Sequence, residues 1–150
     1  MSEIQQYVIF SLDKQIFGIE ILKIKEVVSY REFTPLPNIK GFVKGIIDLK
    51  GVILPVFDFR TKFNLPPTSY THSHTIIVME IWGRIMGVIV DEIFDVVEFL
   101  PEEVQETSNL PPGIKAEYIK GIGKKRQELM ILLDIDRLLS SEELEILDSI

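Results

Sequence analysis

Residues 7–28 read YVIFSLDKQIFGIEILKIKEVV, and residues 76–97 read IIVMEIWGRIMGVIVDEIFDVV. Aligned with an offset of 69 positions, thirteen of the 22 pairs are apolar on apolar or glycine on glycine. Gly18 then falls on Gly87, and Ile24 falls on Ile93. The two stretches predict a small β unit that occurs twice in the chain.

A second match supports the duplication. With an offset of 76, Phe42–Ile46 (FVKGI) falls on Tyr118–Ile122 (YIKGI), and Asp58 falls on Asp134. The alternative is a chance similarity between apolar strand patterns, but the paired glycines and the retained order favour duplication. Two similar units side by side create a groove between them and two outer surfaces. This geometry suits a coupler of partners better than an enzyme with one pocket.

Short apolar runs separated by turn residues predict about five strands in each unit. In the first unit they are Tyr7–Leu12, Gln15–Ile21, a strand entered through one helical turn within Ile21–Val28, Lys44–Leu49 and Val52–Phe57. Such short sheets avoid bare edges by closing on themselves, so we expect a mainly β fold of two small five-stranded SH3-like barrels with short helical turns. Pro55 indicates that its strand lies at an edge or carries a bulge.

We expect a single domain over residues 1–150 with an internal division. The polar, Pro-containing linker Leu65–His74 predicts a first subdomain of about 1–66 and a second of about 74–137. Ser140-Ser141-Glu142-Glu143 has the pattern of a capping box, which predicts a C-terminal helix over about 138–148.

Composition excludes several classes of protein. The chain has no Cys, a net charge of −7 and no apolar run near the ~20 residues of a membrane span. We therefore expect a cytoplasmic protein without a signal peptide, with no direct membrane insertion and no nucleic-acid partner. The net charge is +2 over residues 1–70 and −9 over residues 71–150. This asymmetry indicates either different partners for the two units or a contribution to solubility alone.

Catalytic motifs are absent from the sequence. His72 and His74 lie in the polar linker without a nearby carboxylate cluster, so we expect no metal there. Asp134 and Asp136 fit turn formers and helix caps better than an acid–base pair. We expect no catalytic residues, no metal and no cofactor.

Several segments together resemble the CheW family, the coupling proteins of bacterial chemotaxis. They are Phe42–Arg60 (FVKGIIDLKGVILPVFDFR), Phe17–Val27 (FGIEILKIKEV), Pro35–Asn38 (PLPN), Met86–Asp91 (MGVIVD) and Leu132–Leu139 (LLDIDRLL). The resemblance implies two five-stranded barrels and a non-enzymatic adaptor. Such an adaptor joins the cytoplasmic tip of a chemoreceptor to the regulatory domain of a CheA-type histidine kinase, and it is recruited to membrane receptor arrays.

The resemblance also implies two sets of binding residues. The receptor-binding set is Val8, Ile21, Ile24 and Ile93, and the kinase-binding set is Glu26, Val27, Gly45 and Lys50. The alternative for the receptor-binding set is an ordinary place in the core. The family usually has Asn and Arg where this chain has Asp48 and Lys50, and Lys lacks the planar fork of Arg. We expect Lys50 to pair with Glu26, while a pair with Asp48 is also open.

Two other functions remain as alternatives. One is an SH3-like peptide-binding module outside chemotaxis, which would need an exposed aromatic groove, whereas this chain has a single Trp. The other is a small enzyme, for which the sequence offers no motif.

Overall fold

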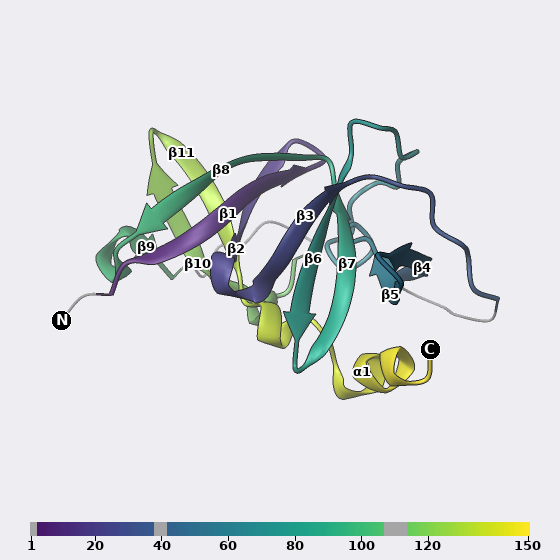
Figure 1. Cartoon of the computed structure of the whole chain (residues 1–150). Coiled ribbons are helices and arrows are strands. Elements are labelled where there is room, and N and C mark those ends of the chain that lie inside the picture. The colour runs from purple at the N-terminus through teal and green to yellow at the C-terminus, as the bar shows by residue number, and fades with distance from the viewer. Residues whose placement is uncertain (1–2, 38–41, 107–113) are drawn as a thin grey trace.

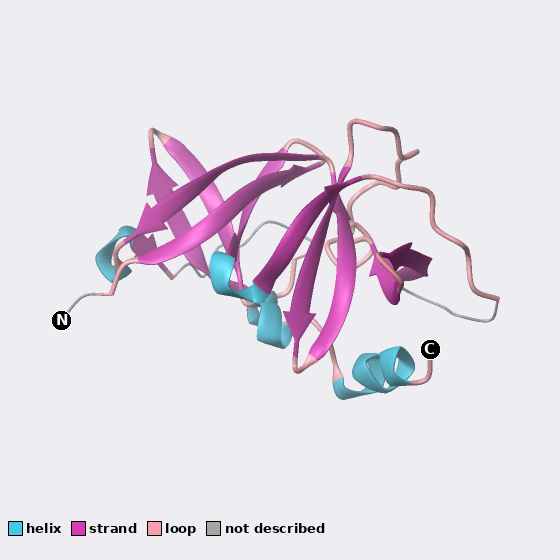
Figure 2. Cartoon of the chain, viewed as in Figure 1, coloured by secondary structure: helices cyan, strands magenta, loops and turns pink. Residues whose placement is uncertain are grey.

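The computed structural model describes residues 3–37, 42–106 and 114–150. Strands dominate this part of the chain, and short helical turns connect them (Figures 1 and 2). The strands are β1 (Gln5–Leu12), β2 (Gln15–Glu20), β3 (Ile24–Ser29), β4 (Val43–Leu49), β5 (Val52–Phe57), β6 (Thr75–Ile81), β7 (Arg84–Val90), β8 (Glu92–Phe99), β9 (Val104–Gln105), β10 (Ile119–Lys125) and β11 (Glu128–Leu133). The helical elements are the 3₁₀ turns η1 (Ile21–Lys23), η2 (Pro101–Glu103), η3 (Ala116–Tyr118) and η4 (Ile135–Arg137), and the helix α1 (Ser141–Asp148).

The strands form two sheets of the same topology. Sheet A has the order β8-β1-β2-β11-β10-β9, and sheet B has the order β3-β6-β7-β5-β4. The offset of 69 relates β1, β2 and β3 to β6, β7 and β8, and the offset of 76 relates β4 and β5 to β10 and β11. Replacing each strand of sheet B by its repeat mate therefore gives the first five strands of sheet A. The predicted mainly β fold of two small five-stranded units is confirmed.

The predicted subdomain boundaries, about 1–66 and about 74–137, do not coincide with the sheets. β1 and β2 belong to sheet A together with β8 to β11, while β6 and β7 belong to sheet B together with β3 to β5. The reason is that the chain crosses between the sheets after η1 and again between β7 and β8 (Figure 1). A cut in the linker Leu65–His74 would leave strands of both sheets on each side.

The strand register repeats residue by residue. Gly18 and Gly87 each lie in a strand with an antiparallel neighbour on one side and a parallel neighbour on the other. The antiparallel pairs are Ile9–Gly18 and Val78–Gly87, and the parallel pairs are Leu132–Gly18 and Val56–Gly87. These partners are themselves related by the offsets of 69 and 76. The two glycines thus occupy equivalent places, as the repeat predicts.

The two sheets share one large core. Buried side chains form a cluster within sheet A around Tyr7 and Ile9, and another within sheet B around Ile76 and Val78. The largest cluster combines Phe10, Phe17 and Leu133 of sheet A with Phe57, Ile77 and Met79 of sheet B. β1 and β6 therefore bury both faces, which explains why they are continuous apolar runs and not alternating ones.

The predicted C-terminal helix is present as α1. The Ser140 hydroxyl accepts a hydrogen bond from the Glu143 amide at 3.1 Å, and the Glu143 carboxylate accepts one from the Ser140 amide at 2.9 Å. Glu143 also binds the ammonium group of Lys62 at 2.6 Å, and Asp148 binds Arg84 at 2.6 Å. These contacts attach α1 to the body of the fold.

The edge position predicted for Pro55 is wrong, because β5 lies inside sheet B between β7 and β4. The other alternative, a bulge, agrees with a register shift in the β4–β5 ladder between Val43 and Gly45, opposite Phe57 and Val56. Pro55 lies opposite Ile46 of β4, whereas the pairing of β5 with β7 begins one residue later, at Val56. The missing amide of Pro55 is therefore tolerated, because no β7 residue pairs with this position.

Candidate functional site

A short hairpin turn positions Lys50 at the end of β4. Lys50 and Gly51 both have a positive φ, 54° and 86°, which matches the right-handed twist of the strands on either side. The carboxylate of Asp48 accepts a hydrogen bond from the Gly51 amide at 2.8 Å. Asp48 thus stabilises the turn, and the alternative in which it pairs with the Lys50 side chain is wrong.

Lys50 pairs with Glu26 instead. The ammonium nitrogen of Lys50 lies 3.2 Å from a carboxylate oxygen of Glu26, and the two side chains are 77% and 36% exposed. Val27, the next residue in β3, is 46% exposed. The predicted Glu26–Lys50 pair is confirmed. Because the pair is open to solvent, it contributes only about 0–1 kcal/mol to folding, and its charges are free to meet a partner.

Gly45 lies in β4, the strand that leads to Lys50. A Cβ atom at this position would lie 2.2 Å from the carbonyl oxygen of Thr34. The absence of a side chain lets Thr34 exchange two backbone hydrogen bonds with Ile46, at 2.8 and 2.9 Å. The segment that follows β3 thereby pairs with β4 and connects the two ends of sheet B. Gly45 shapes the surface through the backbone, since the residue itself is buried.

Sheet A carries a second ion pair that was not predicted from the sequence. Arg126 lies 3.4 Å from Asp95, and the two side chains are 73% and 54% exposed. Asp95 is the repeat mate of Glu26 at an offset of 69, and Arg126 is the mate of Lys50 at an offset of 76. Applying the two offsets to the predicted pair would have found it.

The four residues predicted to bind a receptor differ in exposure. Val8 is buried, whereas Ile21, Ile24 and Ile93 are half-buried. Ile24 and Ile93 both pack against the core that the two sheets share. Ile24 lies opposite Met79 in sheet B. Ile93 lies opposite Phe10 in sheet A, and Phe10 is the repeat mate of Met79. The two isoleucines therefore occupy equivalent positions on that core.

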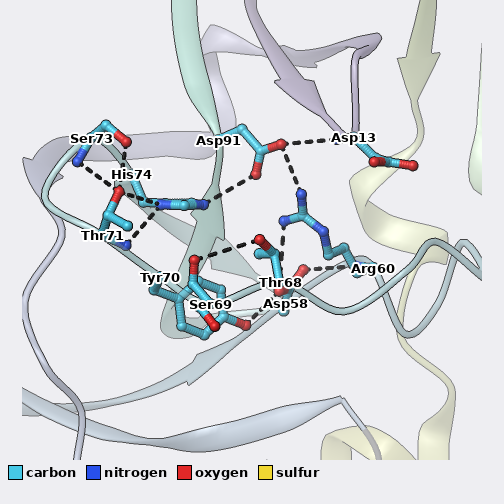
Figure 3. Close-up of polar contacts among 10 residues, drawn as sticks. All are labelled: Asp13, Asp58, Arg60, Thr68, Ser69, Tyr70, Thr71, Ser73, His74 and Asp91. Atoms are coloured by element: carbon cyan, nitrogen blue, oxygen red, sulfur yellow. Dashed lines mark hydrogen bonds and ion pairs between the residues drawn. The ribbon is translucent and has the colours of Figure 1, made fainter.

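A polar cluster spans the crossing from sheet B to sheet A (Figure 3). One carboxylate oxygen of Asp91 accepts hydrogen bonds from the Asp13 amide at 2.9 Å and from the Arg60 guanidinium at 2.8 Å. The other lies 3.4 Å from Nε2 of His74. Because Nδ1 of His74 accepts a hydrogen bond from the Thr71 amide, the neutral ring carries its proton on Nε2, toward Asp91. Asp91 thus connects the β1–β2 turn to the end of β5 and to the linker before β6.

Asp58 completes the cluster. It accepts a hydrogen bond from the Tyr70 hydroxyl at 2.5 Å and lies 4.0 Å from the Arg60 guanidinium. Burial and this hydrogen bond raise the pKa of Tyr70 above its ordinary value. Burial opposes ionisation of Asp91, but the hydrogen bonds from Arg60 and the Asp13 amide outweigh it and lower the pKa of Asp91. The cluster therefore holds Asp91 as an anion.

The described part of the chain was compared with the requirements of a metal site and of a membrane-spanning helix. Within residues 3–37, 42–106 and 114–150, no three side chains of the types His, Cys, Asp or Glu gather where they could hold a metal ion. The helices in these ranges are all too short or too polar to cross a membrane.

Comparison with known proteins identifies the family. Residues 6–143 match the CheW-like domain. The chain is 35% identical over 146 residues to the chemotaxis protein CheW of Klebsiella aerogenes, covering 97% of this chain and 88% of that protein. It is 31% identical to the chemotaxis protein CheW of Treponema pallidum, with coverage of 93% and 85%. The crystal structure of the scaffolding protein TtCheW from Thermoanaerobacter tengcongensis superposes with a TM-score of 0.83 at 27% identity, over 94% of this chain and 91% of that chain. The chain belongs to the CheW family.

Proposed function

We propose that this protein is a non-enzymatic adaptor that couples chemoreceptors to a CheA-type histidine kinase in bacterial chemotaxis arrays. Membership of the CheW family supports this function, and relatives are named as chemotaxis and scaffolding proteins. The observation that carries the proposal is the exposed Glu26–Lys50 pair on sheet B, which differs in chemistry from the half-buried Ile24 and Ile93 on the core between the sheets. A charged set of residues and an apolar set suit two different partners.

The kinase regulatory domain binds at the Glu26–Lys50 surface in this proposal. Glu26 and Lys50 supply the charges, Val27 supplies exposed apolar area, and Gly45 allows the backbone to close beneath them. Exposed charges at an interface mainly set the orientation and rate of encounter, so this surface selects its partner without stabilising the fold.

The receptor tip binds at the apolar residues Val8, Ile21, Ile24 and Ile93. Ile24 and Ile93 are half-buried, so each presents part of its side chain to solvent while the remainder packs against the shared core. An amphipathic helix docks on such a surface through its apolar stripe. The protein works on the cytoplasmic side of the membrane, where receptor arrays recruit it.

The peptide-binding alternative is not favoured. Among the described residues, the large aromatic side chains with high exposure are Trp82 at 62% and Phe94 at 51%. Trp82 lies in the turn between β6 and β7 of sheet B, and Phe94 lies in β8 of sheet A. Separate rings on different sheets do not form the aromatic groove that such a module needs.

A pull-down separates these functions. Immobilised full-length chain should retain both a soluble chemoreceptor tip and the isolated regulatory domain of a CheA-type kinase, and each should bind in the presence of the other. Retention of neither partner, or competition between them for one surface, would contradict the proposal.

A further inference from the structure

The start of β1 in sheet A, beside η1, continues the predicted receptor-binding surface. Side chains alternate along a strand, so Gln6 and Val8 of β1 lie on the same side, together with Ile4 just before the strand. Val8 lies directly opposite Val96, and Gln6 lies opposite Glu98. Residues directly opposite in an antiparallel pair share a face. Ile4 and Val96 are 58% and 42% exposed, so this face remains partly apolar.

Leu22 stands beside this face on η1 with 93% of its surface exposed. Its neighbour Ile21 is half-buried. A leucine in this position adds almost nothing to the packing of the folded chain, and exposed apolar groups that cluster mark interaction sites.

Leu22 lines an open recess of about 480 Å³. The apolar side chains in its wall are Ile4, Ile21 and Leu22, and the carboxylates around them are Glu3, Glu20 and Glu98.

The rim of the recess is negatively charged. No Lys or Arg is among the residues that line it. Glu20 is paired with Lys120. Glu98 accepts a hydrogen bond only from the neutral amide of Gln6, at 3.3 Å, and neither Glu98 nor Glu3 forms an ion pair within the described residues. The electrostatic complement of this rim is a partner that carries Lys or Arg beside an apolar group.

We propose that the recess between Ile4 and Leu22 extends the receptor-binding surface and holds an amphipathic helix of the receptor tip. An apolar side chain of that helix lies against Leu22, and an adjacent Lys or Arg reaches Glu98. The receptor is the occupant because the recess includes Ile21 and lies on the same face as Val8, two residues of the receptor-binding set. The inference rests on the proposed function.

The test compares Leu22→Ser and Glu98→Lys with matched controls on other surfaces. Leu129→Ser removes another exposed leucine, 65% exposed, from β11, and Glu145→Lys reverses an exposed acid on α1. Binding of each purified full-length variant to chemoreceptor-containing membrane vesicles is titrated by co-sedimentation at low and high salt, and binding to the kinase regulatory domain is titrated in parallel.

Leu22→Ser should weaken binding to the vesicles by about tenfold, the scale at which removing a buried interface anchor is felt. Glu98→Lys should weaken it by roughly threefold to tenfold and make it less sensitive to salt. Both controls should bind vesicles as the parent does, and all four variants should bind the kinase domain normally.

Normal vesicle binding by Leu22→Ser and Glu98→Lys, with loss in Ile24→Asp, would overturn this inference and leave the proposed function standing. Weakened kinase binding in place of receptor binding would also overturn it, because the recess would then serve the other partner. If the parent chain does not bind receptor vesicles at all, both the inference and the proposed function fail.

Discussion

The ammonium nitrogen of Lys50 lies 3.2 Å from the carboxylate of Glu26, and this contact joins the two ends of sheet B. Glu26 belongs to β3, the first strand of the sheet order, and Lys50 belongs to the turn that follows β4, the last strand. The repeat mates Asp95 and Arg126 form the corresponding contact on sheet A at 3.4 Å. The duplicated fold thus carries a duplicated charge pair.

Reversing either charge of the first pair, Glu26→Lys or Lys50→Glu, should leave the melting temperature within a few degrees of the parent. Both variants should bind the kinase regulatory domain more weakly, because each places a like charge against the partner. The double reversal should recover part of the binding if the pair acts by orienting this surface. A double-mutant cycle measured by isothermal titration reports the coupling, and purely additive effects would refute it.

The equivalent pair on sheet A is a matched control. Asp95→Lys and Arg126→Glu change the same charges at repeat-equivalent positions, so they should leave one-to-one binding to the kinase domain unchanged. Equal weakening by the sheet A variants would mean that the kinase surface is not confined to sheet B.

Lys50→Arg should tighten binding to the kinase domain modestly, because the guanidinium fork can engage Glu26 and a partner oxygen together.

Gly45→Ala should destabilise the fold more than Gly121→Ala, although the two glycines are repeat mates. The new Cβ at position 45 would meet the backbone oxygen of Thr34 at 2.2 Å, whereas at position 121 the nearest atom is a side-chain methyl of Val104 at 2.5 Å. The backbone at Thr34 can shift less easily than the side chain of Val104, which lies on the short edge strand β9. We expect a loss of about 2–3 kcal/mol at position 45 and about 1 kcal/mol at position 121. Urea denaturation measures both, and the reverse order would contradict this account.

Asp91→Asn should make the stability of the fold less dependent on pH in the acid range. The folded pKa of Asp91 is lower than its ordinary value, so its contribution to stability is fully present above the ordinary pKa. The contribution is lost as the pH falls from the ordinary pKa to the lowered one. Melting temperatures recorded from about pH 7 down to about pH 3 should therefore fall less steeply in the variant than in the parent. Parallel profiles would show that Asp91 is not a source of this dependence.

Arg60→Met should be the most damaging single change in the same cluster. It leaves Asp58, whose side chain is 2% exposed, and Asp91 without their shared cation. Loss of one partner from a buried ion pair costs about 3–5 kcal/mol. The combination with Asp91→Asn should recover part of the loss, and thermal unfolding measures both variants. A single variant as stable as the parent would show that the cluster contributes little.

Ile24→Asp and Ile93→Asp should each weaken binding to a receptor tip at least tenfold, because an unpaired carboxylate would be buried in an apolar contact. Binding to the kinase domain should persist. Phe10→Asp is the control for disruption of the core, because Phe10 is completely buried opposite Ile93. If the isoleucine variants lose binding to the receptor tip and to the kinase domain equally, or unfold as Phe10→Asp does, Ile24 and Ile93 are core residues only.

The strands and turns were predictable because their signals are local. Apolar runs and turn residues place β1, β2, β4 and β5, and the offset of Gly18 from Gly87 establishes equivalent strands. The exchange of strands between the sheets was not predictable, because periodicity indicates which face a residue occupies but not which sheet its strand joins. For the same reason Pro55 predicts an edge or a bulge equally well, and only the sheet order shows that β5 is an interior strand.

Part of the candidate site was predictable from the sequence, and part of it was not. The Glu26–Lys50 pair was predictable from the family resemblance, and its mate Asp95–Arg126 follows from the repeat. The contact of Asp91 with Arg60, 31 positions away, depends on how the linker folds back over the crossing, and no local pattern reports this.

The most direct test of the coupling function is co-sedimentation of a CheA-type kinase with receptor-containing membranes, with and without this protein. We expect the chain to increase the sedimented kinase several-fold, and Ile24→Asp and Glu26→Lys each to reduce the increase strongly by weakening binding to a different partner. An amount of sedimented kinase that does not depend on the chain would show that the chain does not connect receptor and kinase.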